Sequence, residues 1–332
     1  MHMFGYPKQA FLNLPTPVSY LSSLSESLGI ELYMKRDDLT EFGVGGNKLR
    51  KLEYLVYDAK EKGATMLITV GGAQTNHGRL TAAVAAKYQM KCAVVAMDDY
   101  PGILTSNMLL DRIFGACVFL HKNDGTPLMD VVRRVADKFE SQGERCYFIP
   151  MGGSNEIGAL GYYECAQEIK NEFKSGRVVV PLGSMGTYMG LFCGLHGSEL
   201  NLTGVQIMPY EENIFNYAVD YFHRIKEAWK LDFDAVEDDF DIATDYLYGG
   251  YNLPSEAVRD AIYDMARSES IVLDPCYTGK AYAALRDMVK QGKIQKGETV
   301  IFIHTGGLPG VYTPSHQNAF EAELMDGVTI LK

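Results

Sequence analysis

The sequence predicts an α/β protein with two domains. Its 332 residues are more than most single hydrophobic cores contain, which favours two domains. From about residue 64 onwards, short apolar runs alternate with amphipathic stretches. Such alternation of strand and helix patterns indicates parallel sheets with right-handed crossovers. Fully apolar runs such as residues 178–182 fit strands that are covered on both faces.

The individual elements follow in chain order. Apolar runs predict strands at 66–70, 92–97, 117–121, 146–150, 178–182, 204–208 and 300–304. An alanine-rich stretch predicts a helix at 76–88, and the turn at 274–280 opens a helix that runs through Met288. Residues 230–250 are acidic. We expect a solvated connecting loop there, because the carboxylates lack the spacing of a metal site.

Composition narrows the class of protein. The net charge of -11 argues against a general binder of nucleic acid or of membrane surfaces, which is normally basic. No apolar run is long enough to span a membrane, and the first residues lack the apolar core of a signal peptide. Six cysteines are scattered singly without a C-x-x-C pair, which indicates reduced thiols and neither disulfides nor zinc. We therefore expect a cytoplasmic protein without a bound metal.

The run at residues 45–51 is the most informative motif. It places Lys48 behind two glycines and Asn47, with Arg50 and Lys51 within one helical turn. Glycines allow a close backbone approach to a ligand, and a lysine among other cations can lose its proton and act as a nucleophile. Arg50 and Lys51 could hold an anionic group such as a phosphate beside that amine. A glycine turn before a solvated basic helix explains the same residues, so the motif alone leaves both interpretations open.

Two further glycine turns each follow an apolar strand and precede a helix. At 71–77, exposed N–H groups could bind a carboxylate or phosphate, or Thr75 or Asn76 could simply cap the helix. At 183–187, the backbone amides, two hydroxyls and the helix dipole favour a phosphate monoester over a plain tight turn. The second loop has neither the P-loop ending nor the dinucleotide fingerprint.

Two motifs remain near the end of the chain. Tyr277, in the turn at 274–280, is either an acid, base or nucleophile or a half-buried structural residue. Thr305, in the closing motif at 304–310, follows the last strand. Its hydroxyl therefore lies at the strand end where open α/β sheets bind ligands.

Together these motifs resemble the family of D-cysteine desulfhydrase and 1-aminocyclopropane-1-carboxylate deaminase, which are pyridoxal-phosphate enzymes of the tryptophan-synthase-β fold type (fold type II). The resemblance runs from residues 14–17 through 35–39 and 45–48 to 304–307. It implies two domains, each an open, mostly parallel twisted sheet flanked by helices. The small domain is expected at 49–156 and the large cofactor-binding domain at 1–48 and 157–332. It also implies a homodimer.

The resemblance implies roles for single residues. Lys48 looks like the lysine that forms the Schiff base with pyridoxal phosphate, and Asn76 like the donor to the phenolate oxygen of the cofactor. Thr305 would face the nitrogen of the cofactor ring. The phosphate would be held by Lys51 and by a loop of five residues: Gly183, Ser184, Met185, Gly186 and Thr187.

The substrate site follows from the same resemblance. Lys48, Tyr277 and Thr75 are the expected catalytic residues. The substrate would contact Gln74, Thr75, Asn76, His77, Tyr251, Tyr277 and Thr278. Three positions depart from the family pattern: Thr75 replaces a common serine, Met185 a glycine and Tyr188 a histidine.

The chemistry favours β-elimination. Lys48 would anchor the cofactor and remove a Cα proton, so that D-cysteine gives pyruvate, hydrogen sulfide and ammonia. Family deaminases resemble one another in having glutamate and leucine where this chain has Thr278 and Thr305. A neutral hydroxyl at the ring nitrogen suits the loss of a good leaving group better than ring opening. L-Cysteate sulfo-lyase, with Arg79 or His77 near the sulfonate, 1-aminocyclopropane-1-carboxylate deaminase and a non-enzymatic protein that binds the cofactor or an anion remain alternatives.

Overall fold

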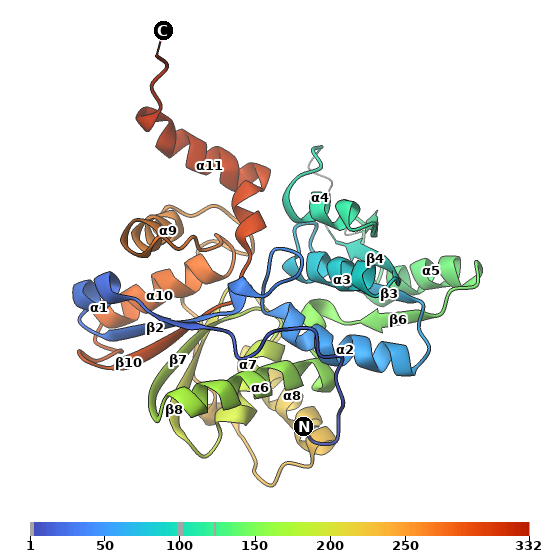
Figure 1. Cartoon of the computed structure of the whole chain (residues 1–332), viewed down its shortest axis with the longest axis horizontal. Coiled ribbons are helices and arrows are strands. Elements are labelled where there is room, and N and C mark those ends of the chain that lie inside the picture. Colours follow the sequence, from blue (N-terminus) through green and yellow to red (C-terminus); the bar gives the residue numbers. More distant parts are fainter. Residues whose placement is uncertain (1–2, 98–101, 123, 332) are drawn as a thin grey trace.

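Two sheets organise the chain in the computed structural model, which describes residues 3–97, 102–122 and 124–331 (Figure 1). The larger sheet has the order β1-β2-β10-β7-β8-β9. Its strands are β1 (Val18–Tyr20), β2 (Glu31–Arg36), β7 (Ser175–Leu182), β8 (Glu199–Gln206), β9 (Ile242–Ala243) and β10 (Thr299–His304). Only β1 pairs antiparallel with its neighbour; the other pairings in this sheet are parallel.

Alternating side chains of the larger sheet supply two hydrophobic cores. In β7, Val178 and Val180 join one core while Val179 joins the other, as the two-residue period of a strand requires. The first core includes residues of α6 (Glu156–Glu172), α7 (Gly186–Leu195) and α8 (Ile214–Trp229). The second includes residues of α1 (Ser22–Leu28), α9 (Glu256–Glu269) and α10 (Thr278–Lys290). Both faces of the sheet are therefore covered, which explains its fully apolar strands.

The smaller sheet is all parallel, with the order β5-β4-β3-β6. Its strands are β3 (Met66–Gly71), β4 (Lys91–Ala96), β5 (Cys117–Leu120) and β6 (Cys146–Ile149). One face packs on α2 (Lys48–Glu61) and α3 (Asn76–Lys87), and the other on α5 (Leu128–Glu140). In Figure 1 this sheet lies with α3, α4 (Ser106–Ile113) and α5 on the right, beside the larger sheet on the left.

The seven strands predicted from apolar runs are confirmed, with ends that differ by a few residues. Strands β1, β2 and β9 were not predicted. Strand β9 lies inside the acidic stretch 230–250, where Asp241 bonds to the Thr203 hydroxyl at 2.6 Å, so the prediction of a connecting loop was wrong for that part. The expected domain limits at 48/49 and 156/157 stay a prediction.

Short helical turns and α11 (Pro314–Leu324) complete the fold. The turns are η1 (Asp37–Leu39), η2 (Met151–Gly153), η3 (Glu237–Asp239), η4 (Leu308–Tyr312) and η5 (Met325–Gly327). Helix α11 projects away from both sheets and leads to the C-terminus (Figure 1). Among the helices of the described residues, none is both long and apolar enough to cross a bilayer. All six cysteines are free thiols, and no group of side chains in the described part could hold a metal ion.

Candidate active site

A cavity of about 250 Å³ lies where loops and helix starts from the two sheets meet. Eleven of the predicted site residues line it: Lys48, Thr75, Asn76, His77, Gly183, Ser184, Met185, Thr187, Tyr251, Tyr277 and Thr305. Four others do not line it: Lys51, Gln74, Gly186 and Thr278. Segments separated by more than 200 residues in the chain thus meet around one space.

Backbone contacts place Lys48 at the first turn of α2. The Asn47 amide donates to the Thr305 carbonyl at 3.0 Å, which ties this turn to the end of β10. Gly45 has φ +68°, and a Cβ there would lie 2.0 Å from the Asp38 carbonyl oxygen. A Cβ on Gly306 would lie 2.7 Å from the Gly46 Cα. These glycines therefore allow two segments of the chain to touch each other.

The Lys48 amine faces the cavity without a counterion. Among the described residues, no carboxylate forms an ion pair with it and no hydrogen bond to its Nζ is present. Burial lowers the pKa of Lys48 to about 8, although the negative charge of Asp274 acts in the opposite direction. The lowered pKa therefore increases the fraction of Lys48 that is a free, nucleophilic amine near neutral pH.

Lys51 lies one turn further along the same face of α2. Its fully buried ammonium donates to the Gly152 carbonyl at 3.1 Å and to the Ser154 hydroxyl at 3.3 Å, both neutral groups. Burial and the neighbouring Lys48 lower the pKa of Lys51 well below its ordinary value. A buried ammonium with neutral partners is costly, and an anion beside it would offset that cost.

The loop 183–187 lies beside this ammonium. The Ser154 hydroxyl accepts from the Gly186 amide at 3.2 Å and lies 2.8 Å from the Ser184 hydroxyl. The Thr187 hydroxyl accepts from the Asn47 carboxamide at 3.0 Å, which leaves its own hydrogen free to donate. Hydroxyls, the start of α7 and a buried cation converge here. This combination is suited to a phosphate.

Two residues of this region carry unusual backbone requirements. Met185 is 2% exposed and has φ +64°, a region that favours glycine. A Cβ on Gly152 would lie 2.0 Å from the Ser184 Oγ, so η2 can approach the loop only with glycine there. Met185, which stands where the family often has glycine, thus keeps a glycine-like, strained backbone conformation and buries its side chain.

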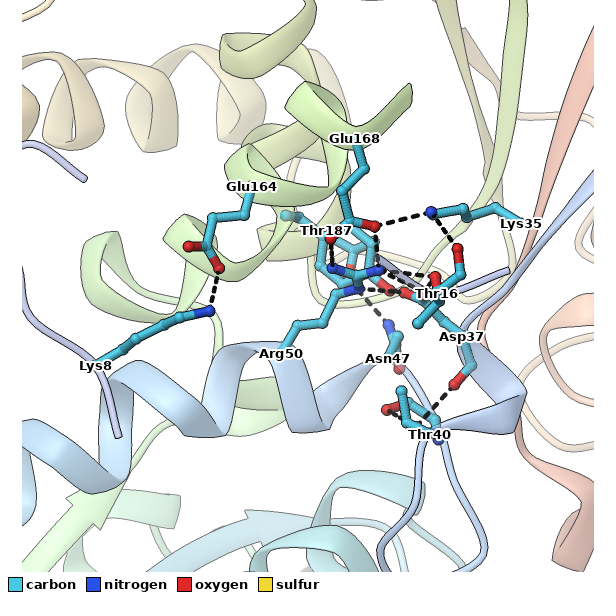
Figure 2. A network of polar contacts seen from close by, with 12 residues as sticks. Lys8, Thr16, Lys35, Asp37, Thr40, Asn47, Arg50, Glu164, Glu168 and Thr187 are labelled. Carbon is cyan, nitrogen blue, oxygen red and sulfur yellow. Dashed lines mark hydrogen bonds and ion pairs between the residues drawn. The ribbon is translucent and has the colours of Figure 1, made fainter. Parts of the chain in front are cut away.

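Arg50 does not belong to the anion site, which corrects the expectation from sequence. Two residues after Lys48, it points away from the cavity toward α6 (Figure 2). Its guanidinium donates to both Asp37 oxygens at 2.8 and 2.9 Å and to both Glu168 oxygens at 2.8 and 2.9 Å. Lys35 bonds to Glu168 at 2.8 Å in the same buried network. The charge of Arg50 is neutralised within the protein.

The turn at 72–76 contributes the other wall of the cavity. Thr75 is the N-cap of α3 and its Oγ1 accepts from the Gly78 amide at 3.4 Å, so the capping alternative applies to this residue. Asn76 accepts at Oδ1 from the Asn107 carboxamide at 3.0 Å. The Gln74 side chain instead bonds to the start of α4, accepting from the Asn107 amide at 3.0 Å. The structure therefore places Gln74 away from the space that a substrate would fill.

His77 is buried and neutral. It is 2% exposed, and neither ring nitrogen has a hydrogen-bond partner of good geometry in the described part of the chain. Burial and the charges of Lys48 and Lys51 lower the pKa of His77 well below its ordinary value, although the Pro150 carbonyl acts in the opposite direction. This imidazole lines the cavity.

Tyr277 and Tyr251 lie next to each other in the cavity lining, with their rings edge to face. Their hydroxyl oxygens lie 2.6 Å apart, and burial raises the pKa of Tyr277 well above its ordinary value. Behind them, Lys280 donates to the carbonyls of Ile207 at 3.2 Å and Leu247 at 2.8 Å, and also to that of Gly250. This ammonium fastens the loop before Tyr251 to the helix that follows Tyr277.

Thr278 lies beside the cavity wall, and its hydroxyl is already used. Asp274 accepts hydrogen bonds from the Thr278 amide and hydroxyl, both at 2.7 Å, and from the amides of Cys276 and Tyr277 at 3.0 and 2.9 Å. Burial raises the pKa of Asp274 although these hydrogen bonds lower it. Thr305, in contrast, lines the cavity.

The residues present fit a phosphorylated aldehyde. A partly deprotonated amine opens to the cavity, and a second, buried ammonium without a carboxylate partner lies beside a loop of hydroxyls and amides. The buried His77 adds two nitrogen atoms without a good partner in the described part. Gly152 and Ser154, which also belong to this anion site, were not predicted from the sequence. The Gly152-Gly153 pair, one residue after the predicted strand 146–150, was the signal that could have found them.

Comparison with known proteins agrees with this geometry. The family model described as pyridoxal-phosphate dependent enzyme matches residues 10–306. The chain belongs to this family. D-cysteine desulfhydrase of Salmonella typhimurium is 39% identical over 328 residues, covering 94% of this chain and 97% of that protein. A putative 1-aminocyclopropane-1-carboxylate deaminase of Pyrococcus abyssi is 34% identical over 315 residues, covering 92% and 93%.

A solved structure extends the likeness to the whole fold. The crystal structure of an ACC deaminase homologue superposes with a TM-score of 0.86 at 33% identity, covering 97% of each chain. This family member is therefore built on the two-sheet architecture expected from the sequence, and pyridoxal phosphate is its cofactor.

Proposed function

We propose that the protein is a β-eliminating carbon–sulfur lyase that converts D-cysteine and water to pyruvate, hydrogen sulfide and ammonia. The observation that carries the proposal is the Lys48 amine, which faces the cavity with a pKa lowered to about 8. The names of relatives at 39% and 34% identity, a D-cysteine desulfhydrase and a putative deaminase, support the reaction class.

Each wall of the cavity has a distinct task in this proposal. When bound, pyridoxal phosphate supplies an aldehyde that condenses with amines and a ring that withdraws electrons from bonds at Cα. Lys48 would hold the cofactor and, once free, take the proton from Cα of the substrate. Lys51 and the loop 183–187 would bind the phosphate. The amides and hydroxyl of the turn at Thr75 and Asn76 would orient the substrate carboxylate, and Tyr277, which also lines the cavity, would face the substrate.

The proposal of β-elimination rests on neutral groups near the end of β10. Thr305 lines the cavity with a neutral hydroxyl. Asp274 already accepts four hydrogen bonds from residues 276–278, one of them from the Thr278 hydroxyl. A neutral partner leaves the ring nitrogen of the cofactor unprotonated, which suffices to expel hydrosulfide. Opening a cyclopropane that has no Cα proton requires a stronger electron sink.

Release of sulfite from L-cysteate has weaker support. A sulfonate requires extra donors or cations, for which Arg79 and His77 were the candidates. Arg79 is fully buried outside the cavity lining, where it donates to the Asn107 Oδ1 at 2.7 Å and the Gly45 carbonyl at 3.2 Å. His77 is held neutral. Neither residue supplies a free cation.

A substrate panel tests the reaction. The purified protein loaded with pyridoxal phosphate is given D-cysteine, L-cysteine, L-cysteate, chloroalanine or 1-aminocyclopropane-1-carboxylate, and keto acid is measured. We expect the highest kcat/KM with D-cysteine. Preference for the cyclopropane substrate or for L-cysteate would replace our assignment by one of those alternatives. No keto acid from any substrate would favour a binding protein without turnover.

The role of Lys48 has a test that does not depend on turnover. Borohydride reduction of the loaded protein should fix the cofactor to Lys48, which peptide mapping can locate. Lys62→Ala, at an exposed position just after the same helix, is the matched control and should label like the wild type. An adduct at another lysine would overturn the assignment.

Thr278 and Thr305 are proposed to set reaction choice. The paired change Thr278→Glu and Thr305→Leu adds a carboxylate beside Asp274 and removes a hydroxyl from the cavity. The ratio of ring-opening to desulfhydration activity should rise. An unchanged ratio would show that these two positions do not govern the choice.

We also propose that the enzyme is a cytoplasmic homodimer. Six free thiols support a reducing compartment. Exposed apolar side chains on and before α4, among them Ile103 and Ile113, support a surface that a second copy covers. Light scattering after gel filtration should give twice the monomer mass, and cell fractionation should recover the enzyme with cytoplasmic markers. A monomer at micromolar concentration would contradict the first part.

A further inference from the structure

Asn107 is a buried residue that touches the candidate active site without lining it. It lies in the first turn of α4 with no exposed surface. Its Nδ2 donates to the Gln74 carbonyl at 2.7 Å and to the Asn76 Oδ1 at 3.0 Å. Its backbone amide donates to the Gln74 Oε1 at 3.0 Å. Three hydrogen bonds thus join one residue of α4 to Gln74 and to Asn76, the first residue of α3.

Arg79 determines which way the Asn107 carboxamide is turned. The Arg79 Nε donates to the Asn107 Oδ1 at 2.7 Å. A guanidinium has donors and no acceptor, so the Asn107 oxygen must face Arg79 and its nitrogen must face Asn76. The nitrogen of Asn107 can only donate, so Asn76 must turn its oxygen toward Asn107. The remaining group of Asn76, its Nδ2, is thereby directed away from Asn107.

That nitrogen lies close to the turn after β10, whose Thr305 lines the cavity. A Cβ on Gly307 would lie 3.0 Å from the Asn76 Nδ2, which places the amide next to the turn that follows Thr305. No described residue accepts a hydrogen bond from this Nδ2, and Asn76 lines the cavity. An oriented and unused donor is therefore held where the cofactor would lie.

We propose that Asn107 is a positioning residue, which with Arg79 holds the Asn76 carboxamide so that its nitrogen donates to the phenolate oxygen of the cofactor. The inference deepens the proposed function and rests on it for the location of the cofactor. Arg79 is suited to the task because it is fully buried and its guanidinium also donates to the Gly45 carbonyl at 3.2 Å. The link therefore joins the Asn76 turn to the segment that carries Lys48.

Other charges near Arg79 belong to the same cluster. Asp111, one turn later on α4, is buried with no hydrogen-bond partner for either oxygen in the described part. Burial raises the pKa of Asp111 to about 7, and burial lowers that of Arg79 to about 10. The start of α4 is further fixed by the Ser106 hydroxyl, which donates to the Pro309 carbonyl in η4. Asn107 thus sits in a rigid setting that both sheets share.

The decisive variant is Asn107→Asp. A carboxylate can still accept from Arg79 but cannot donate, so Asn76 must turn its nitrogen toward residue 107 and its oxygen toward the phenolate. Loss of the donor to the phenolate strengthens the attraction of that oxygen for the neighbouring imine proton. The pH midpoint of the visible absorption band of the loaded protein should therefore rise, by about one unit. Met108→Leu, at the adjacent buried position, should leave the midpoint unchanged.

A double-mutant cycle separates positioning from general damage. If Asn107 acts through Asn76, Asn107→Asp should shift the midpoint in the wild-type background and have no further effect in Asn76→Ala. Should Asn107→Asp fail to fold, Asn107→Ala also frees Asn76 to rotate and should shift the midpoint in the same direction, by less.

The outcomes distinguish this inference from the proposed function. A visible band whose midpoint is the same in wild type and both Asn107 variants overturns the role of Asn107 alone. An equal shift in the Asn76→Ala background also overturns it. If the wild-type protein gives no visible band with pyridoxal phosphate, the proposed function itself fails.

Discussion

Helix α2 has two faces that carry cations, and the protein treats them in opposite ways. On one face, Arg50 contacts the carboxylates of Asp37 and Glu168 in a network with no exposed cation (Figure 2). On the other, Lys48 and Lys51 have no carboxylate partner among the described residues. The cation that has carboxylate partners within the protein therefore stabilises the fold. The two cations that lack such partners are available to bind a ligand.

The largest effect should come from removing the amine at the open face. Lys48→Ala should lower kcat/KM by about 10⁴-fold or more, because anchor and base are lost together. The free energy of unfolding should not fall, since an uncompensated cation is removed. Steady-state kinetics and urea denaturation check both parts. Near-normal turnover would overturn the mechanism.

On the other face of α2, removal of the cation should lower the stability of the protein and leave the cofactor site intact. Arg50→Met should lower the free energy of unfolding by about 3–5 kcal/mol, because Asp37 and Glu168 remain without their cation. The folded fraction should still bind pyridoxal phosphate. Urea denaturation measures the loss of stability. Arg50→Lys should lose less stability, because lysine keeps the positive charge although it lacks the planar guanidinium that binds two carboxylate oxygens at once. A stability equal to the wild type would show that the network contributes little.

The pH dependence of stability gives an intermediate effect. Lys48 has its pKa lowered from 10.5 to about 8 on folding, so between these values the unfolded chain binds more protons. The contribution of Lys48 to the free energy of unfolding therefore rises from pH 8 to 10.5, by about 3 kcal/mol at most, and is lowest below pH 8. Cofactor-free wild type and Lys48→Met, denatured with urea from pH 7 to 10, should give curves that converge as the pH rises. Parallel curves would contradict the shift.

The smallest expected effect concerns Lys51. Lys51→Met should weaken binding of pyridoxal phosphate by roughly 10–100-fold, the loss of one charge-assisted contact. The cofactor-free protein should keep or gain stability, because the buried ammonium has only neutral partners. Titration with the cofactor checks the expected loss of affinity. Urea denaturation of the cofactor-free protein checks that its stability does not fall. A clear loss of stability would place Lys51 with Arg50 as a structural cation.

Much of the fold could be read from apolar runs, and the failures have physical causes. Strand β2 escaped notice because it contains Lys35 and Arg36, and Lys35 is buried only because Glu168 on distant α6 pairs with it. Helical periodicity could have separated Arg50 from Lys48 and Lys51, since positions two apart point in different directions.

In the site too, residues whose positions depend on sequence neighbours were easier to predict than residues that depend on distant parts of the chain. The glycine loops and Lys48 could be placed from their own motifs. Gln74 could not, because its position depends on Asn107, which no local pattern linked to it. The contact of Thr278 with Asp274 lies within one turn of the chain and was open to prediction as a local cap. The backbone of Met185 at φ +64° is likewise invisible in the sequence, which gives no sign that this residue occupies a glycine-like conformation.

The contact between Gly152 and Ser184 limits how such a site can be redesigned. Because a Cβ at residue 152 would overlap the Ser184 hydroxyl, η2 and the loop 183–187 pack so closely that a change in one requires a change in the other. A library that varies either loop alone would sample mostly broken sites, whereas varying both together would let them adapt to a different anion. The smallest unit of change in this seat is therefore a pair of loops, whose Ser154 and Ser184 lie 30 residues apart in the chain.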